Sequence, residues 1–209
     1  MLVAIMLLVA SCATGTSSMN GEVFLEDKGT AYKVKTPAWV DSAIEGGARE
    51  VETMAEYRDF IIFIAQFEDQ SLQGAQLVAE KMDAQTELAS YLSLRVKDAF
   101  KGARLTDAES KLLGVFGESF LASVAEATYS GFRKDTDWWI KVQTSASGNK
   151  PERQFYRIFQ LWTIPKSMLN EQFAMLSASL QADLPPTAEN KKAVDLVQGI
   201  VAKEFFEEK

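Results

Sequence analysis

Two segments of this chain would, if they form strands, carry apolar side chains on both faces. Residues 57–67 read YRDFIIFIAQF and residues 154–164 read QFYRIFQLWTI. Successive side chains of a strand point to opposite faces of its sheet, so both faces of these segments need a cover. Aromatic and β-branched residues also favour strands. We therefore predict a sheet with elements packed on both faces, and we place 57–67 as a central strand rather than an edge strand.

The second segment completes a predicted hairpin with residues 137–144, across a turn region of small and polar residues. Adjacent Trp138 and Trp139 must point to opposite faces, so at least one of them points away from the main helices. One interpretation is a sheet buried on both sides within a single domain. The other is an apolar surface left for a partner. The residues of this candidate interaction surface are Trp138, Trp139, Tyr156 and Trp162.

Helical patterns fill most of the remaining chain. Apolar residues recur at three- and four-residue steps from 70 to 101, which predicts one long amphipathic helix. Thr106 and Glu109 form a capping box for a second helix that reaches about residue 127. The expected fold class is α+β, a small antiparallel sheet of about three to four strands packed with amphipathic helices in the order β-α-α-β-β-α-α. The other predicted elements are a turn or short helix at 41–45 that Gly46-Gly47 ends, a helix at 167–182 and a last helix after Thr187.

The amino-terminal segment indicates where the protein resides. Residues 1–10 are apolar, but this run is far shorter than the roughly 20 residues of a membrane-spanning helix and is typical of an export signal. Val9-Ala10-Ser11-Cys12 resembles the lipobox that lipoprotein signal peptidase recognises. The resemblance implies cleavage between Ser11 and Cys12 and a lipid on the Cys12 sulfur. We therefore expect a signal peptide at 1–11, a flexible tether at 12–21 and a single α+β domain at 22–209.

One feature departs from this pattern, because export signals usually open with Lys or Arg and the first basic residue here is Lys28. A start upstream of Met1 would account for it. The alternative is a buried N-terminal strand or helix with Cys12 in the core. No Asp follows Cys12, which in enteric-type sorting favours the outer membrane. The predicted location is therefore the cell envelope, with a lipid anchor in the outer membrane.

The composition argues against most catalytic and nucleic-acid functions. The chain has no histidine, which removes the commonest general base and the usual nucleophile and zinc partners. Its net charge of −7 disfavours binding to phosphates of nucleic acid. The pairs Glu50 with Glu52 and Asp135 with Asp137 could act as acid and base or hold a cation, but solvated turns and helix ends explain them better. We predict a protein that is not an enzyme and has no cofactor or metal.

Six motifs recur in one known family: Cys12 behind the lipobox, Pro37-Ala38-Trp39-Val40, Ala84 to Ala89, Leu94-Arg95-Val96, Trp138-Trp139 and Tyr156 to Lys166. Together, over about Thr36 to Lys166, they resemble the LPP-twenty family of bacterial surface lipoproteins. The resemblance implies a compact α+β domain akin to flagellar-assembly lipoproteins and penicillin-binding-protein activator lipoproteins, and no enzyme. The chain departs from the family at Ala65-Gln66-Phe67, where a glycine-rich start is common, and in a helix after Pro186.

These observations lead to two hypotheses for the function. The first is a non-catalytic, lipid-anchored envelope protein that binds another envelope component through the aromatic hairpin or a sheet edge. Its partners would be the membrane, through the lipid on Cys12, and an envelope protein, with no nucleic acid. The second is a carrier of a lipid or other small apolar ligand between the sheet and the last helix, which needs an apolar cavity of roughly 300 Å³ or more.

Overall fold

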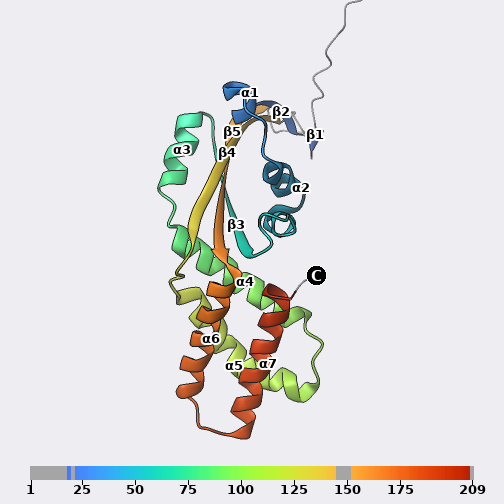
Figure 1. Cartoon of the computed structure of the whole chain (residues 1–209), viewed down its shortest axis with the longest axis vertical. Helices are drawn as coiled ribbons and strands as arrows, with labels where there is room; N and C mark the ends of the chain where they lie inside the picture. Colours follow the sequence, from blue (N-terminus) through green and yellow to red (C-terminus); the bar gives the residue numbers. More distant parts are fainter. Residues whose placement is uncertain (1–17, 20–21, 145–151, 208–209) are drawn as a thin grey trace, which may run out of the picture.

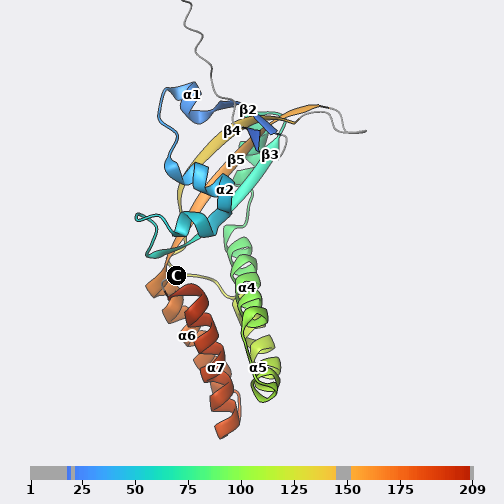
Figure 2. The same cartoon turned by 90° about the vertical axis from the view of Figure 1, so that its right-hand side faces the viewer.

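The computed structural model describes residues 18–19, 22–144 and 152–207, with the side chains of Ser18, Met19 and Val115 not described. The molecule has two halves joined end to end (Figures 1 and 2). The sheet half contains the β-sheet with helices α1, α2 and α3, and the helical bundle contains α4, α5, α6 and α7. The predicted α+β class is confirmed.

The sheet is antiparallel, with the strand order β1-β2-β4-β5-β3. Four strands form its body, and the two-residue β1 extends one edge. The strands are β1 (Ser18–Met19), β2 (Glu22–Asp27), β3 (Phe60–Asp69), β4 (Arg133–Thr144) and β5 (Arg153–Pro165). The helices are α1 (Lys28–Tyr32), α2 (Ala38–Glu52), α3 (Leu72–Glu80), α4 (Ala84–Gly102), α5 (Asp107–Glu126), α6 (Lys166–Ala182) and α7 (Ala188–Phe205).

The single helix predicted at 70–101 is wrong, because the structure has two helices there, α3 and α4. Asp83 separates the two helices. Its side chain accepts hydrogen bonds from the backbone N–H groups of Gln85 and Thr86 and so caps the start of α4. The apolar pattern continues on both sides of this cap. Periodicity alone therefore concealed the break.

The segment before β3 holds more structure than expected. The predicted short helix at 41–45 is part of α2, which continues to Glu52. Gly47 does leave the helical conformation, at φ 70° and ψ −156°, but the chain resumes its helical turn afterwards. A residue without Cβ adopts this positive φ at little cost, so the glycine bends the helix instead of ending it. Strand β2 and helix α1 were not predicted.

The placement of 57–67 as a central strand is wrong, because β3 lies at an edge of the sheet and, among the described strands, pairs with β5 alone. The apolar residues on both of its faces are buried, with Ile61 and Ile62 each almost fully enclosed. The apolar pattern of a strand predicts which of its faces are buried, but it does not predict whether both of its edges pair with other strands. The two properties are independent, and the prediction confused them.

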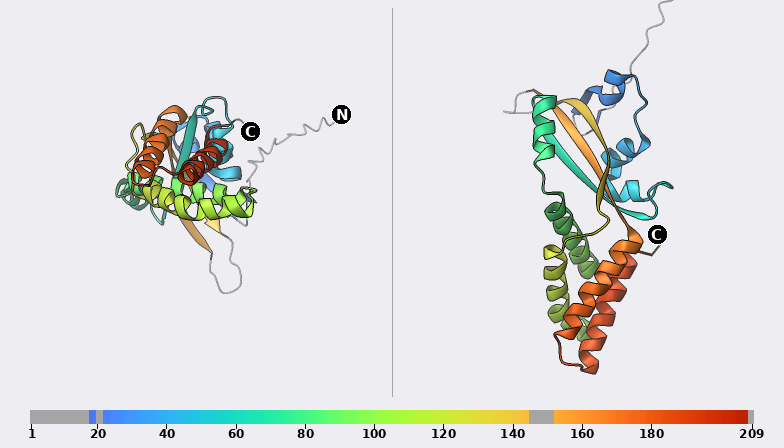
Figure 3. Two further views of the ribbon diagram at one scale, coloured as in Figure 1. Left: turned by 90° about the horizontal axis from the view of Figure 1, so that it is seen from below. Right: turned by 60° about the vertical axis from the view of Figure 1, so that its left-hand side comes forward.

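Helices cover both faces of the sheet (Figure 3). Helix α2 packs on the face that carries Trp138, Phe159 and Leu161, whereas α3 packs on the opposite face against Trp139 and Ile158. On the face of the sheet that α3 covers, the part nearer the bundle continues into the core of the helical bundle. There Ile61 and Ile164 belong to the same buried cluster as residues from α4, α5, α6 and α7.

Candidate functional site

The predicted lipid anchor, with cleavage at Ser11 and Cys12, lies outside the described residues. The first described strand falls within the stretch that was expected to be a tether. Ser18 and Met19 form β1 and pair with Val23 and Glu22 of β2. Only residues 13–17 therefore separate Cys12 from the folded sheet.

The structure separates the aromatic residues that the sequence grouped as one interaction surface. Trp138 is 5% exposed and lies beneath α2, whereas Trp139 is 7% exposed on the other face beneath α3. Tyr156 contacts Trp139, with ring centroids 5.8 Å apart. The helices of the chain itself therefore cover both adjacent tryptophans.

Trp162 lies on the same face as Tyr156 but six positions further along β5, about 20 Å away at the rise of a strand. Its ring stacks on Phe132 at a centroid distance of 5.0 Å. Trp138, Trp139, Tyr156 and Trp162 therefore do not form the single candidate interaction surface predicted above, and the alternative of a sheet buried on both sides describes the tryptophans of the hairpin better. The strands have apolar side chains on both faces because both faces are buried within the chain.

The end of the sheet half opposite the bundle carries an exposed apolar and basic surface, which we call the α1 end. Asp27 caps α1 by accepting a hydrogen bond from the Thr30 N–H at 2.6 Å. The chain then turns through Lys33, which has a left-handed conformation with φ 55°. The exposed side chains of the α1 end are Leu25, Tyr32, Lys33, Val34 and Lys35.

A groove of about 390 Å³ lies beside the α1 end, between β2 and α2. Its apolar lining comes from Phe24, Val40, Ile44 and Ile140, with Leu25 at its side. Acidic residues also line the groove: Glu26, Asp27, Asp41 and Glu45.

The outer edge of β3 presents unpaired backbone groups. Asp59 accepts a hydrogen bond from the Lys166 N–H at 2.9 Å, whereas the Phe60 N–H bonds to Tyr57 and not to β5. Antiparallel pairing alternates, and the register from Phe60 to Asp69 contains no bulge, so even-numbered residues point their N–H groups outward. Within the described part of the chain, the N–H groups of Ile64, Gln66 and Glu68 have no hydrogen-bond partner.

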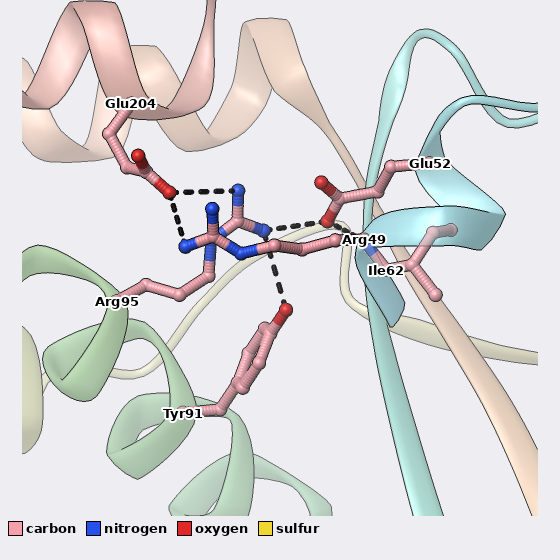
Figure 4. A network of polar contacts seen from close by, with 6 residues as sticks. All are labelled: Arg49, Glu52, Ile62, Tyr91, Arg95 and Glu204. Atoms are coloured by element: carbon pink, nitrogen blue, oxygen red, sulfur yellow. Dashed lines mark hydrogen bonds and ion pairs between the residues drawn. The ribbon is translucent and has the colours of Figure 1, made fainter. Parts of the chain in front are cut away.

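The start of the same outer edge is closed by a carboxylate. Glu52, at the end of α2, accepts the Ile62 N–H at 3.0 Å. The same oxygen of Glu52 accepts a hydrogen bond from Arg95 of α4 at 2.6 Å (Figure 4). Glu52 therefore joins β3 of the sheet half to a helix of the bundle.

Arg95 is the centre of a charged cluster at the junction of the two halves, and only 6% of the residue is exposed. Its guanidinium also donates to the Tyr91 hydroxyl at 3.3 Å and lies 4.5 Å from the ring centroid of Phe205. Glu204 of α7 lies 3.7 Å from Arg95 and forms a 2.6 Å ion pair with Arg49 of α2 (Figure 4). Three separate helices therefore meet through this cluster.

The surroundings of Arg95 keep its charge. Burial alone would lower the pKa of Arg95, but the neighbouring Tyr91 and Glu52 raise that pKa above its usual value. Burial raises the pKa of the Tyr91 hydroxyl, which therefore stays a hydrogen-bonding phenol at neutral pH. The cluster is a set of ion pairs and hydrogen bonds around a charged Arg95.

Sequence reasoning missed this cluster, although a signal was present. Arg95 follows Leu88 and Leu92 at helical spacing, so it occupies a position on the apolar stripe of α4. A charged residue on a buried stripe requires a partner. The sequence could not identify Glu52, because the two residues are 43 positions apart.

In each of the two carboxylate pairs considered above, the two acidic residues have different surroundings. Glu52 belongs to the Arg95 cluster, while Glu50 is exposed. Asp137 pairs with Lys28 at 2.8 Å and with Lys134 at 2.9 Å, and Asp135 accepts a hydrogen bond from Tyr57 at 3.1 Å. Among residues 18–19, 22–144 and 152–207 there is no acidic group arranged to hold a metal ion, and no helix long and apolar enough to cross a membrane.

Comparisons with known proteins identify no relative: no protein-family model, no curated protein and no solved structure matches this chain.

Proposed function

We propose that this chain is a lipid-anchored bacterial envelope lipoprotein with no catalytic role, and that its domain binds another envelope component. The observation that carries this proposal is the apolar run that ends in Val9-Ala10-Ser11-Cys12, only a few residues before the first strand of the sheet. Two or three acyl chains on Cys12 would anchor the protein stably, at about 0.8 kcal/mol per buried CH₂. The likeness to the LPP-twenty family, in the motifs quoted above, belongs to the same proposal.

The outer edge of β3 is the surface that we propose for the partner. An extended segment of another protein adds a strand to such an edge by pairing with its free backbone groups. Ile64, Gln66 and Glu68 offer their outward N–H groups for this pairing. The buried aromatic hairpin is less suitable, because Trp138 and Trp139 lie under the helices of the chain itself.

A carrier of a small apolar ligand is the second candidate. The groove that favours it lies between β2 and α2, and not between the sheet and the last helix as expected from the sequence. Its volume of about 390 Å³ exceeds the roughly 300 Å³ that such a ligand needs. The acidic lining would favour an uncharged or cationic ligand. Native mass spectrometry of delipidated protein would show a bound small molecule if the protein is a carrier, and Ile44→Trp would displace it.

Metabolic labelling with radioactive palmitate tests the anchor. Wild-type protein should incorporate label and float with membranes, and Cys12→Ser should lose both properties. Ser17→Ala is the matched control, because it alters the same segment without removing the thiol, and it should behave as wild type. Label or membrane retention in Cys12→Ser equal to wild type would reject the anchor.

Crosslinking in intact envelopes tests the edge of β3. Gln66→Pro removes one outward N–H but leaves the hydrogen bonds between β3 and β5, so the fold should persist. We expect Gln66→Pro to lose a crosslinked partner that wild type and Gln66→Ala retain. The same crosslinked species at equal yield in all three proteins would exclude the edge as the binding surface.

A further inference from the structure

The α1 end combines apolar and basic side chains on a protein that is otherwise acidic. Tyr32 is 66% exposed, Val34 51% and Leu25 43%. Lys33 and Lys35 alternate with Tyr32 and Val34 along the chain and are exposed as well. From Lys28 to Val40 the sequence has three lysines and no acidic residue, whereas the whole chain carries a net charge of −7.

No described residue neutralises these two lysines. Lys28 is engaged with Asp137, but Lys33 and Lys35 form no ion pair within the described part of the chain. The nearest acidic residues along the chain are Asp27, six positions before Lys33, and Asp41, six positions after Lys35; Asp41 and the neighbouring Glu26 are exposed and form no ion pair with either lysine. The Asp27 carboxylate is occupied by hydrogen bonds from the hydroxyls of Thr30 and Thr36.

The position of β1 brings the α1 end close to the proposed anchor. Because β1 runs antiparallel to β2, Ser18 lies beside Val23 and Met19 beside Glu22. The amino end of β1 is therefore the end nearer to Leu25 and α1, and Figures 1 and 2 place β1 and α1 together at the end of the molecule away from the bundle. From Cys12 to Ser18 the chain spans at most about 20 Å, at roughly 3.3–3.6 Å per residue.

We propose that the α1 end lies against the lipid headgroups of the membrane that holds the anchor. In this arrangement Tyr32 and Val34 enter the interface, and Lys33 and Lys35 contact anionic phosphates. Aromatic rings with a polar tip favour this depth, and lysines near an anionic surface favour it further. The inference rests on the proposed lipid anchor, and it adds an orientation: the helical bundle points away from the membrane.

A fluorescent probe at position 34 tests this orientation on the lipidated full chain. Lipid would block the thiol of Cys12, the only native cysteine, so Val34→Cys provides a single site for a polarity-sensitive dye. Met175→Cys on α6 is the matched control, since Met175 is an apolar residue that is 63% exposed in the bundle. Both proteins are placed in vesicles of phosphatidylethanolamine with phosphatidylglycerol, and in vesicles of phosphatidylcholine alone.

We expect blue-shifted emission at position 34 and none at position 175, with the larger shift in the vesicles that contain phosphatidylglycerol. Lys33→Gln with Lys35→Gln should remove that difference between lipids. Equal emission at both positions would overturn the orientation, and equal emission at position 34 in both lipids would overturn the role of the lysines. Dye uptake by the wild-type protein would show a free Cys12, which would reject the anchor itself and not merely the orientation.

Discussion

The sheet half and the helical bundle are stabilised in different ways. All four tryptophans lie in the sheet half, at Trp39, Trp138, Trp139 and Trp162, and ion pairs such as Arg157 with Glu22 and Glu68 cross its surface. The bundle has a core of aliphatic side chains and phenylalanines from four helices. The helices of the bundle follow from local periodicity except for the break before α4, whereas the edge position of β3 and the burial of the tryptophans in the sheet half depend on contacts between distant segments.

The two halves nevertheless share one buried cluster. Ile61, Phe63 and Ile164 from the strands pack with the helix residues of the bundle core, and the Arg95 cluster joins the halves beside them. We therefore expect both halves to unfold in one transition. Three of the four tryptophans, Trp39, Trp138 and Trp139, belong to the clusters of the sheet half, whereas Trp162 packs against the shared cluster. Tryptophan fluorescence therefore reports mainly on the sheet half, and far-ultraviolet circular dichroism is dominated by the helices, so the two signals can be compared.

Phe173→Ala should give the largest loss of stability. Phe173 contacts the rings of Phe120, Tyr129 and Phe205 at centroid distances of 5.8, 6.3 and 5.5 Å and is 3% exposed. Removing such a buried ring lowers the free energy of unfolding by about 3–5 kcal/mol. Urea unfolding should show the fluorescence and dichroism transitions moving together.

Met175→Ala is the control for this substitution, because it lies on the same helix with an exposed side chain and should change stability by less than about 0.5 kcal/mol. If Phe173→Ala shifted the dichroism transition and left the fluorescence transition unchanged, the two halves would be independent folding units.

Arg95→Met should destabilise the protein by about 3 kcal/mol, because it leaves Glu52 at the junction without its buried counter-ion. The double variant Glu52→Gln with Arg95→Met removes both charges, while the glutamine oxygen can still accept the Ile62 N–H. We expect it to be less destabilised than the sum of the single variants in a double-mutant cycle of urea unfolding. Additive effects would mean that the two side chains do not stabilise the junction as a pair.

Asp137→Asn should have a smaller effect that depends on pH. Burial alone would raise the pKa of Asp137, but hydrogen bonds from Lys28 and Lys134 lower it below the ordinary value of 3.8. A lowered pKa in the folded state contributes stability at neutral pH, and that contribution is lost as the pH falls below 3.8 through the folded pKa. The side chain is 38% exposed, so screening by solvent keeps the effect under about 1 kcal/mol.

Urea unfolding at pH 7 and at pH values below 4 measures this effect. The difference between wild type and Asp137→Asn should shrink on acidification. Asp98→Asn is the control, because its ion pair with Lys101 is two-thirds exposed, with 67% exposure of each side chain, and its loss should matter less. A difference that grows below pH 4 would contradict the assigned role of Asp137.

Several elements were predictable from the sequence because their signals are local. Thr106 and Glu109 form the expected capping box of α5, with both hydrogen bonds present. The hairpin of β4 and β5 and the alternation of Phe155 and Phe159 against Ile158 and Ile164 are confirmed, since each depends only on neighbouring residues.

The remaining features depend on contacts that no local pattern contains. The edge position of β3 depends on the order of the strands in the sheet, in which β5 pairs with β4 on one side and with β3 on the other. The Arg95 cluster depends on the approach of α2, α4 and α7. The burial of Trp138 and Trp139 depends on α2 and α3, which cover them. The length of α2 was not predicted. For the candidate site, the sequence indicated Cys12 but not the exposed surface of the α1 end, because exposure depends on the packing of distant segments.

The mass of the mature protein purified from membranes tests the central claim of a lipid-anchored domain most directly. The account predicts a chain that begins at Cys12 and carries a mass increase equal to a diacylglycerol, with or without a further acyl chain, on its amino-terminal peptide. An amino-terminal peptide that retains residues 1–11, or one with an unmodified Cys12 thiol, would contradict it.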